Sequence, residues 1–282
     1  MSAPRIDAHH HLWDPATRAY PWMAGEGLAP IRRRYDLDAL RDNAVRLGVE
    51  HTVLVQTVSD EDETREFLRT AQASDGLIAG VVGWVDLSAP HVADRLAALR
   101  EGHGGRLLVG IRHQVEDEAD PHWLGGAAVL RGIHAVGRAG LAYDLLVQQA
   151  QWQAALELAL AMPDVRLVLD HAGKPPIASG DLREWSRWLG KLAACNNVTV
   201  KLSGLATEAH WGTWSVADLQ PVGCRVLELF GADRVMLGSD WPVCELAGPA
   251  EQVWAATRAL VPQDSLDAAL GGTAAATYRL SI

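Results

Sequence analysis

The feature that most constrains the fold is a regular alternation of short apolar segments with longer amphipathic ones along the whole chain. The short segments are rich in β-branched and aliphatic residues, which predicts strands, and nearly every one is followed by a segment with helical spacing. We expect strands at residues 6–12, 51–56, 77–87, 106–113, 141–147, 165–171, 198–203 and 234–240. We expect helices at residues 36–47, 60–74, 91–100, 122–138, 149–161, 181–194, 216–230, 250–260 and 266–280.

This alternation predicts a parallel sheet, and eight strand–helix units within 282 residues predict an α/β fold of the (β/α)8 TIM-barrel type, in regular or distorted form. Several strands are apolar on both faces, as expected where helices cover one face and a barrel interior the other. The alternative is an open, doubly wound sheet, but no Gly-x-Gly-x-x-Gly motif follows the first strand. Since no break in composition marks a boundary, we expect residues 1–282 to form a single barrel domain.

Composition narrows the functional classes. The net charge is −10, and Arg32, Arg33 and Arg34 form the one basic run that stands out, so we expect no nucleic-acid partner and no anionic membrane surface. No segment approaches the roughly 18 apolar residues that span a bilayer. The three cysteines are widely spaced and odd in number. The N-terminal residues lack a charged segment followed by an apolar run, so we expect no signal peptide. The cysteine pattern is typical of reduced thiols, so we expect a cytoplasmic protein.

Three consecutive histidines end the first predicted strand. Side chains alternate between the two faces of a strand, so His9 and His11 are expected to point to one face and His10 to the other. Asp7 has the same parity as His9 and is expected one layer deeper. Two imidazoles on one face can share a metal ion, although a histidine run can also be a surface turn.

Polar and aromatic residues stand at the ends of nearly all the predicted strands. Active sites of such barrels lie at the carboxyl ends of the strands, and burying ionisable groups costs several kcal/mol unless they are paired or bound. Each residue alone has a structural explanation, such as a helix cap or an ion pair. The set as a whole predicts a site, with His9, His11, His171 and Asp240 at its centre. The other residues at strand ends are Gln56, Trp84, Asp86, Arg112, His113, Glu116, Asp117, Glu118, Tyr143, Asp144, Asp170, Lys174, Lys201, Ser203, Ser239 and Trp241.

The residue types indicate the chemistry. Imidazoles with a carboxylate form a nitrogen and oxygen site that suits zinc or a similar divalent ion, and such an ion polarises a carbonyl group. A carboxylate at Asp240 can take the proton from an attacking water. The predicted reaction is therefore hydrolysis at an acyl centre. The side chains predicted to hold the substrate or a developing oxyanion are Arg112, Tyr143, Lys201, Trp84 and Trp241.

The motifs resemble those of the amidohydrolase superfamily: Asp-x-His-x-His on the first strand, a histidine after the sixth and an aspartate after the eighth. The strings IDAHHHLWDP, GIRHQVEDE, LVLDHAGKP, VKLSGL and GSDWPV look like the amidohydrolase-2 branch, which contains sugar lactonases such as L-fuconolactonase. The resemblance covers nearly the whole chain. It implies hydrolysis of a sugar-derived lactone, L-fuconolactone or a similar aldonolactone, to the sugar acid.

The resemblance also implies roles for individual residues. His9 and His11 would be ligands of a metal or of the substrate carbonyl, with Asp240 as a further metal ligand and general base. His171 would be a catalytic histidine, and Arg112 and His113 would contact the lactone. The fourth strand ends without a lysine, which argues against a carboxylated-lysine bridge between two metals. One divalent ion at most is expected, zinc before others, and lactonases of this branch differ in whether they need it.

Two other functions remain open at this point. Metal-dependent decarboxylases of the same superfamily share the histidines and the late aspartate, and a barrel of this kind can also bind a sugar acid without turnover. Specificity is expected to depend on residues 13–34, on residues 116–123 and on the residues after Trp241. The sequence defines neither the particular lactone nor the oligomeric state.

Overall fold

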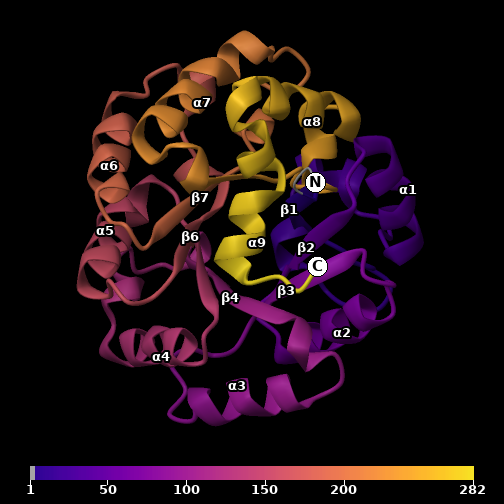
Figure 1. Cartoon of the computed structure of the whole chain (residues 1–282), viewed down its shortest axis with the longest axis vertical. Coiled ribbons are helices and arrows are strands. Elements are labelled where there is room, and N and C mark those ends of the chain that lie inside the picture. Colours follow the sequence, from indigo (N-terminus) through magenta and orange to yellow (C-terminus); the bar gives the residue numbers. More distant parts are fainter. Residues whose placement is uncertain (1–3) are drawn as a thin grey trace.

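The computed structural model describes residues 4–282, in which a barrel of eight parallel strands is surrounded by helices (Figure 1). Each strand pairs with the next along the chain, which confirms the predicted (β/α)8 barrel. The strands are β1 (Ile6–His10), β2 (His51–Val55), β3 (Ile78–Gly83), β4 (Leu108–Gln114), β5 (Ala142–Leu146), β6 (Leu167–Leu169), β7 (Val198–Leu202) and β8 (Val235–Leu237). The helices are α1 (Leu37–Leu47), α2 (Glu61–Gln72), α3 (Val92–Glu101), α4 (Ala127–Arg138), α5 (Trp152–Ala161), α6 (Arg183–Ala193), α7 (Val216–Phe230), α8 (Ala250–Ala259) and α9 (Thr273–Tyr278).

The barrel is nearly closed, with one unsealed seam between β8 and β1. Their backbones meet at a bridge between His10 and Trp241, just beyond the end of β8. Two hydrogen bonds support this bridge: the His11 amide donates to the Trp241 carbonyl at 2.7 Å, and the Asp240 amide donates to the His9 carbonyl at 2.8 Å. The seam therefore joins the two segments that carry the predicted metal ligands.

A bulge in β1 decides which side chains reach the barrel interior. Relative to β2, β1 has an extra residue between Asp7 and His10. Asp7 consequently lies in the seam, where its carboxylate accepts hydrogen bonds from the Ser239 amide at 2.8 Å and hydroxyl at 2.5 Å. The expected position of Asp7 one layer below His9 is therefore wrong, because simple alternation does not hold across a bulge. His9 and His11 still share one face.

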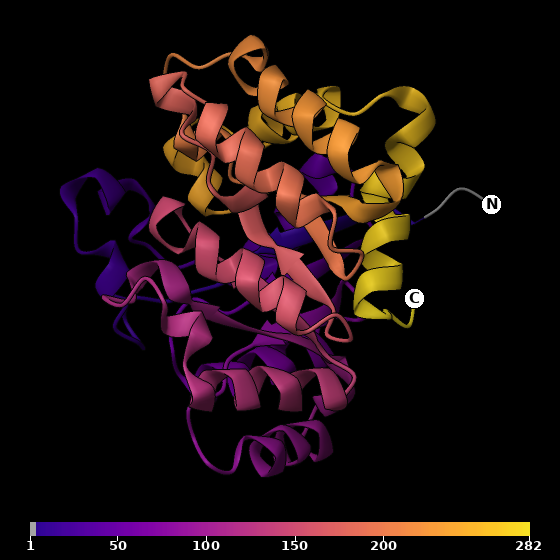
Figure 2. The same cartoon turned by 90° about the vertical axis from the view of Figure 1, so that its left-hand side faces the viewer.

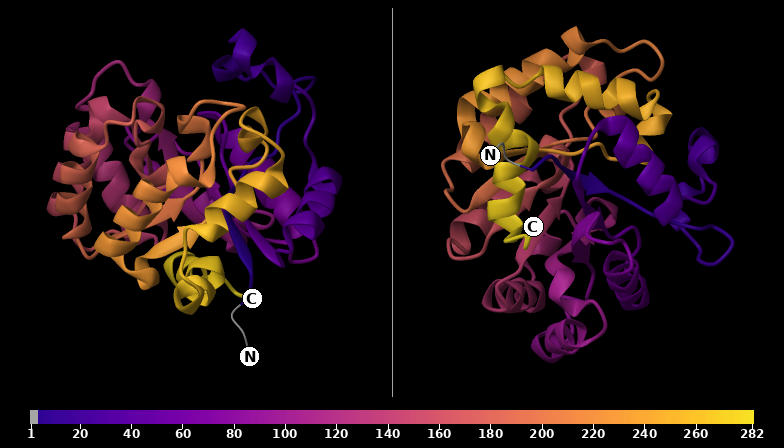
Figure 3. Two further views of the ribbon diagram at one scale, coloured as in Figure 1. Left: turned by 90° about the horizontal axis from the view of Figure 1, so that it is seen from above. Right: turned by 45° about the vertical axis from the view of Figure 1, so that its right-hand side comes forward.

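Apolar side chains fill one end of the barrel interior, and α9 closes that end. In Figure 1, α9 (yellow) lies across the near end of the barrel, and Figure 2 shows it from the side, next to the C-terminus. The left view of Figure 3 shows the loop over residues 13–34, the first loop (indigo), at the opposite end of the barrel. The interior side chains packed with Ala274 and Tyr278 of α9 are Ile6, Ala8, Val53, Val55, Val82, Val109, Ala142, Val168 and Met236.

Some predicted helices differ from the structure at glycines. In place of one helix over residues 266–280, a π-helix (Ala268–Gly272) precedes α9. A Cβ atom on Gly271 would lie 1.7 Å from the Pro4 carbonyl oxygen, so close backbone packing against the first strand requires glycine there. The predicted helix over residues 122–138 likewise begins only at Ala127, after Gly125 and Gly126. Among residues 4–282, every helix is too short or too polar to cross a bilayer.

The loop over residues 13–34 is held by structure of its own. Two 3-10 helices, Pro21–Met23 and Glu26–Ile31, interrupt it. Its ends are tied together because Trp13 and Tyr35 exchange backbone hydrogen bonds of 3.0 and 2.8 Å. The loop is thus a compact excursion with closed ends, of the kind that often carries function.

Candidate active site

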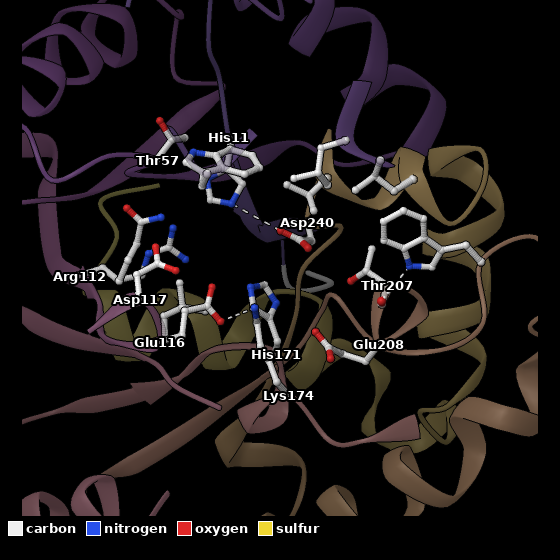
Figure 4. A pocket seen from close by; sticks show the side chains of 17 residues that line it. His11, Thr57, Arg112, Glu116, Asp117, His171, Lys174, Thr207, Glu208 and Asp240 are labelled. Carbon is white, nitrogen blue, oxygen red and sulfur yellow. Dashed lines mark hydrogen bonds and ion pairs between the residues drawn. The ribbon is translucent and has the colours of Figure 1, made fainter. Parts of the chain in front are cut away.

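A cavity of about 250 Å³ opens at the carboxyl ends of the strands, at the end of the barrel opposite to α9 (Figure 4). The segments predicted to set specificity contribute to its wall: Trp22 and Leu28 come from the first loop, and Val243 and Leu246 follow Trp241. The other apolar wall residues are Leu146 and Trp211. The polar ones are His11, Thr57, Arg112, Gln114, Glu116, Asp117, His171, Lys174, Thr207, Glu208 and Asp240.

His9, His11 and Asp240 converge at the base of this cavity. His9 Nε2 lies 3.1 Å from His11 Nε2. Asp240 Oδ1 lies 3.7 Å from His9 Nε2 and 3.5 Å from His11 Nε2. Figure 4 marks the contact between His11 and Asp240 with a dashed line. His10 turns away, with its Nε2 atom 2.9 Å from Thr52 Oγ1.

His171 stands beside this group and is held by a residue of the next strand end. Its ring centroid lies 4.5 Å from that of His9, and its Nδ1 atom lies 2.9 Å from Ser203 Oγ. His171 has a φ of 52° and Asp240 a φ of 56°, a left-handed conformation that residues other than glycine rarely adopt. Strain of this kind persists where the surrounding structure enforces it, and it is concentrated at functional sites.

Burial makes the three imidazoles neutral. It lowers the pKa of His9 well below its ordinary value, that of His11 to about 3 and that of His171 to about 4. Burial also raises the pKa of the Asp240 carboxyl. Neutral imidazoles have lone pairs for a metal or for hydrogen bonds, and a carboxylate with a raised pKa is a better base than an exposed one.

The donor atoms fit a single divalent ion. The ligand atoms of His9, His11 and Asp240 lie within 4.8 Å of one another. A tetrahedral ion with bonds of about 2.0–2.1 Å would separate its ligands by roughly 3.3 Å, close to the distances given above. His11 Nδ1 donates to the Val55 carbonyl at 2.8 Å, which leaves the lone pair on Nε2.

Asp170 supplies a second indication for such an ion. Its buried Oδ1 atom lies 3.3 Å from His9 Nδ1 and 3.0 Å from Lys201 Nζ. A His9 tautomer protonated at Nδ1 would donate to this oxygen and direct the Nε2 lone pair toward His11 and Asp240. Carboxylates commonly orient metal-ligating histidines in this way.

Lys201 lies beneath the cavity and does not line it. Its side chain is fully buried, with Nζ 2.7 Å from Asp144 Oδ2, 3.0 Å from Asp170 Oδ1 and 3.2 Å from His9 Nδ1. The Tyr278 hydroxyl donates to Asp144 Oδ2 at 2.6 Å. The ammonium group that was expected to contact substrate is thus placed to support His9 from below.

Of the predicted substrate-binding residues, Arg112 lines the cavity. Its guanidinium group is fixed by hydrogen bonds: Nε donates to Gln56 Oε1 at 3.0 Å, Nη2 to the Gln56 carbonyl at 2.6 Å and Nη1 to Asp170 Oδ2 at 3.0 Å. Nη1 also lies 3.4 Å from His9 Nε2. The same register that turns Arg112 inward turns His113 and Tyr143 outward. In the pairing of β4 with β5, Arg112 faces Asp144, whereas His113 faces Leu145.

His113 therefore lies behind the cavity wall, where it orders the acidic loop after β4. The Trp84 indole N–H donates to His113 Nδ1 at 2.9 Å, so the proton on Nε2 is free to donate to Glu118 Oε1 at 2.7 Å. The His113 ring also stacks on Trp123 with centroids 4.2 Å apart. Trp241 likewise lies outside the wall, with its indole N–H directed to Glu245.

The segment after β7 adds wall residues that were not predicted: Thr207, Glu208 and Trp211. They lie beyond Ser203, the last residue predicted at that strand end. The helical turn at Glu208 is too short to give a periodic pattern in the sequence. Lys174, in contrast, stands among the residues noted at strand ends. It forms an ion pair with Glu116 across the cavity wall.

We expect Gly204→Ala to lower the free energy of unfolding more than Gly212→Ala does. Both glycines have a positive φ (61° and 78°), so both variants carry backbone strain of about 1 kcal/mol or more. A Cβ atom on Gly204 would also lie 2.6 Å from His171 Nδ1, whereas nothing lies within 4 Å at Gly212. Urea denaturation should show a further loss of about 1–3 kcal/mol for Gly204→Ala. Equal losses would mean that the chain can move His171 at no cost.

Comparison with known proteins agrees with this geometry. The sequence profile of the family described as Amidohydrolase matches residues 6–280. The chain is 38% identical to an L-fucono-1,5-lactonase of Burkholderia multivorans over 99% of this chain and 97% of that one. It is 39% identical to an L-fucono-1,5-lactonase of Burkholderia ambifaria over 86% of this chain and 82% of that one.

A solved structure gives the same assignment. The fold is similar to that of an amidohydrolase of Burkholderia multivorans crystallised with bound zinc, with a TM-score of 0.90 and 37% identity. The match covers 99% of this chain and 100% of that one. The chain therefore belongs to the amidohydrolase family.

Proposed function

We propose that this chain is a lactonase that hydrolyses a neutral, sugar-derived lactone of the L-fucono-1,5-lactone type to the open sugar acid. The observation that carries the proposal is the convergence of Asp240 with three neutral histidines and Arg112 around one small cavity. Its volume of about 250 Å³ lies just below the usual range of small-molecule sites, roughly 300–1,000 Å³, and suits a single sugar ring. Relatives named L-fucono-1,5-lactonase support the same substrate class.

The charges of the wall favour a lactone over the substrate of a decarboxylase. The substrate of a decarboxylase carries a carboxylate, and binding this charge requires a cation that is not already paired. Both cations of the wall are already paired, Arg112 with Asp170 and Lys174 with Glu116. The wall also contains the carboxyl groups of Asp117 and Glu208, which disfavour an anionic ligand. A neutral ligand rich in hydroxyl groups suits such a wall better.

The reaction follows from the positions of the side chains. Unprotonated Asp240 takes a proton from a water molecule while the water oxygen bonds to the carbonyl carbon of the lactone. Negative charge develops on the carbonyl oxygen, and N–H groups of His171 and Arg112 stabilise it. The bond from the carbonyl carbon to the ring oxygen then breaks, and Asp240 returns the proton to that oxygen. The product is the open-chain hydroxy acid.

His9, His11 and Asp240 would hold the divalent ion that the family implies, and zinc suits these donors. Such an ion, when bound, polarises the carbonyl group. The zinc-bound relative supports this choice of ion. We place the protein in the cytoplasm and in carbohydrate catabolism, because its three cysteines are unpaired and its relatives act on sugar lactones.

The proposal is tested by a hydrolysis screen with a pH indicator over sugar lactones, run with and without a chelator. We expect acid release from an L-fucono-1,5-lactone or a close aldonolactone. Release of carbon dioxide from a carboxylated substrate would favour the decarboxylase instead. Saturable binding of a sugar acid with no turnover of any lactone would favour a binding protein. Loss of activity with the chelator, restored by zinc, would support the metal site.

For hydrolysis that persists after treatment with the chelator, we expect kcat/KM to rise with pH through an acid limb that lies above the ordinary range of aspartate. Burial raises the pKa of Asp240, and only the unprotonated carboxylate can accept a proton from water, so activity is lost as pH falls through that pKa. Initial rates between about pH 4 and pH 7, corrected for spontaneous hydrolysis, measure the limb. A flat profile over this interval would remove Asp240 from the role of base.

A further inference from the structure

Glu208 occupies a fixed position in the cavity wall. It ends the 3-10 helix Ala206–Glu208, which follows β7. Its amide donates to the Leu205 carbonyl at 3.2 Å, and the neighbouring Thr207 hydroxyl donates to the Gly204 carbonyl at 2.7 Å. The carboxylate lines the cavity and is labelled in Figure 4. The backbone thus places this carboxylate at the wall without help from a side-chain partner.

Among residues 4–282, Glu208 and Asp117 are the charged groups of the wall whose carboxylates have no hydrogen-bond or ion-pair partner. Arg112 binds Asp170, Lys174 binds Glu116, and Asp240 faces the histidine pair. Within residues 4–282, the Glu208 carboxylate makes no hydrogen bond or ion pair, and burial raises its pKa. A partly desolvated carboxylate has up to four acceptor positions, and leaving them unfilled costs free energy. A ligand with hydroxyl groups would fill them.

An aromatic ring borders the same part of the wall. The Trp211 indole N–H is committed to the Thr207 carbonyl at 2.9 Å, so the ring can offer the cavity its apolar surface but not its donor. A carboxylate that accepts from hydroxyl groups, next to an aromatic surface that packs on C–H groups, matches the two kinds of surface on a sugar ring. A lactone ring without hydroxyl groups would contact only the aromatic surface of Trp211.

We propose that Glu208 is a specificity-determining residue that accepts hydrogen bonds from ring hydroxyl groups of a neutral lactone, an inference that rests on the proposed function. It explains selection in two directions. A lactone without hydroxyl groups leaves the carboxylate unpaired, and a lactone bearing a carboxylate is repelled by it. Glu208 takes no part in proton transfer, so its contribution depends on the hydroxyl groups of the substrate and not on the ester.

The test compares L-fucono-1,5-lactone with δ-valerolactone, which has the same six-membered ring but neither the hydroxyl groups nor the methyl group. Glu208→Ala should lower kcat/KM for the sugar lactone roughly 10- to 100-fold, as expected for losing hydrogen bonds to a charged acceptor. For δ-valerolactone it should change kcat/KM less than about twofold. Glu101→Ala, at the exposed end of α3, is the matched control and should change neither value.

Equal losses on both lactones, or no loss on either, would overturn the inference. If the wild-type protein hydrolyses neither lactone, the proposed function fails, and binding of the non-hydrolysable 1,5-lactam analogue of the sugar decides about Glu208 by calorimetry. The inference then requires wild-type binding that Glu208→Ala weakens about tenfold or more. Unchanged or absent binding of the lactam would contradict it.

Discussion

Asp240→Asn is expected to reduce kcat for lactone hydrolysis by about 10²- to 10⁴-fold, with a smaller effect on KM. The amide keeps the size of the carboxylate but cannot accept a proton from water at neutral pH. The side chain is buried and lies 3.5 Å from His11 Nε2, so no other carboxylate is placed to substitute for it at that point. Steady-state kinetics on L-fucono-1,5-lactone measure the loss.

Two controls separate chemistry from folding. Asp233→Asn, at an exposed site in the turn before β8, should retain wild-type rates. Asp240→Asn should unfold at a urea concentration close to that of the wild type, because it removes a buried charge without changing the shape of the residue. A variant that kept more than about a tenth of wild-type kcat would exclude Asp240 as the base.

The barrel could be predicted because its signal is repeated eight times along the chain. Any one apolar segment is ambiguous, but strict alternation with helical segments leaves few folds open. The seam could not be predicted in the same way. It depends on the bulge between Asp7 and His10, and the extra residue leaves the apolar and polar pattern of so short a strand nearly unchanged.

The centre of the candidate site could be predicted for a related reason. His9, His11, His171 and Asp240 stand at strand ends, and parallel strands bring those ends together whatever the details of the loops. Their roles in binding and catalysis remain predictions that the experiments above address. The geometry shows only that the four side chains meet where the fold requires.

The substrate contacts were harder to predict because strand register decides which side chains face inward. His113 and Arg112 are adjacent in the sequence, yet His113 supports the acidic loop from behind the cavity wall, whereas Arg112 lines the cavity. Tyr143 lies on the outer face of β5 for the same reason. Glu208 lies in a loop, where no periodicity links sequence to direction. Burial and register, which become known only with the fold, separate these cases.

Lys201→Met is expected to destabilise the protein by about 3–5 kcal/mol, the usual range for removing one partner of a buried ion pair. The ammonium group has carboxylate oxygens of Asp144 and Asp170 within 3.0 Å, in a part of the barrel closed to solvent. Methionine fills the volume but leaves Asp144 without a cation and leaves Asp170 with Arg112 alone. Lys191→Met, at an exposed position of α6, should change stability by less than about 0.5 kcal/mol.

The loss of stability caused by Lys201→Met should grow as pH rises. Burial already raises the pKa of Asp144 to about 6 even with Lys201 present, and removing the cation raises it further. A carboxyl group whose pKa is higher in the folded state than in the unfolded state disfavours folding at a pH above its unfolded value. Urea unfolding at about pH 8 should therefore show a larger deficit than at about pH 5.

A second substitution tests the cause of this loss. Adding Asp144→Asn to Lys201→Met removes the carboxylate charge that the lost lysine leaves unpaired. The amide keeps an acceptor for the Tyr278 hydroxyl, which donates to Asp144 at 2.6 Å. The double variant should be more stable than Lys201→Met alone, a coupling that a double-mutant cycle measures directly. If the two losses simply add, the buried lysine acts through its packing volume and not through its charge.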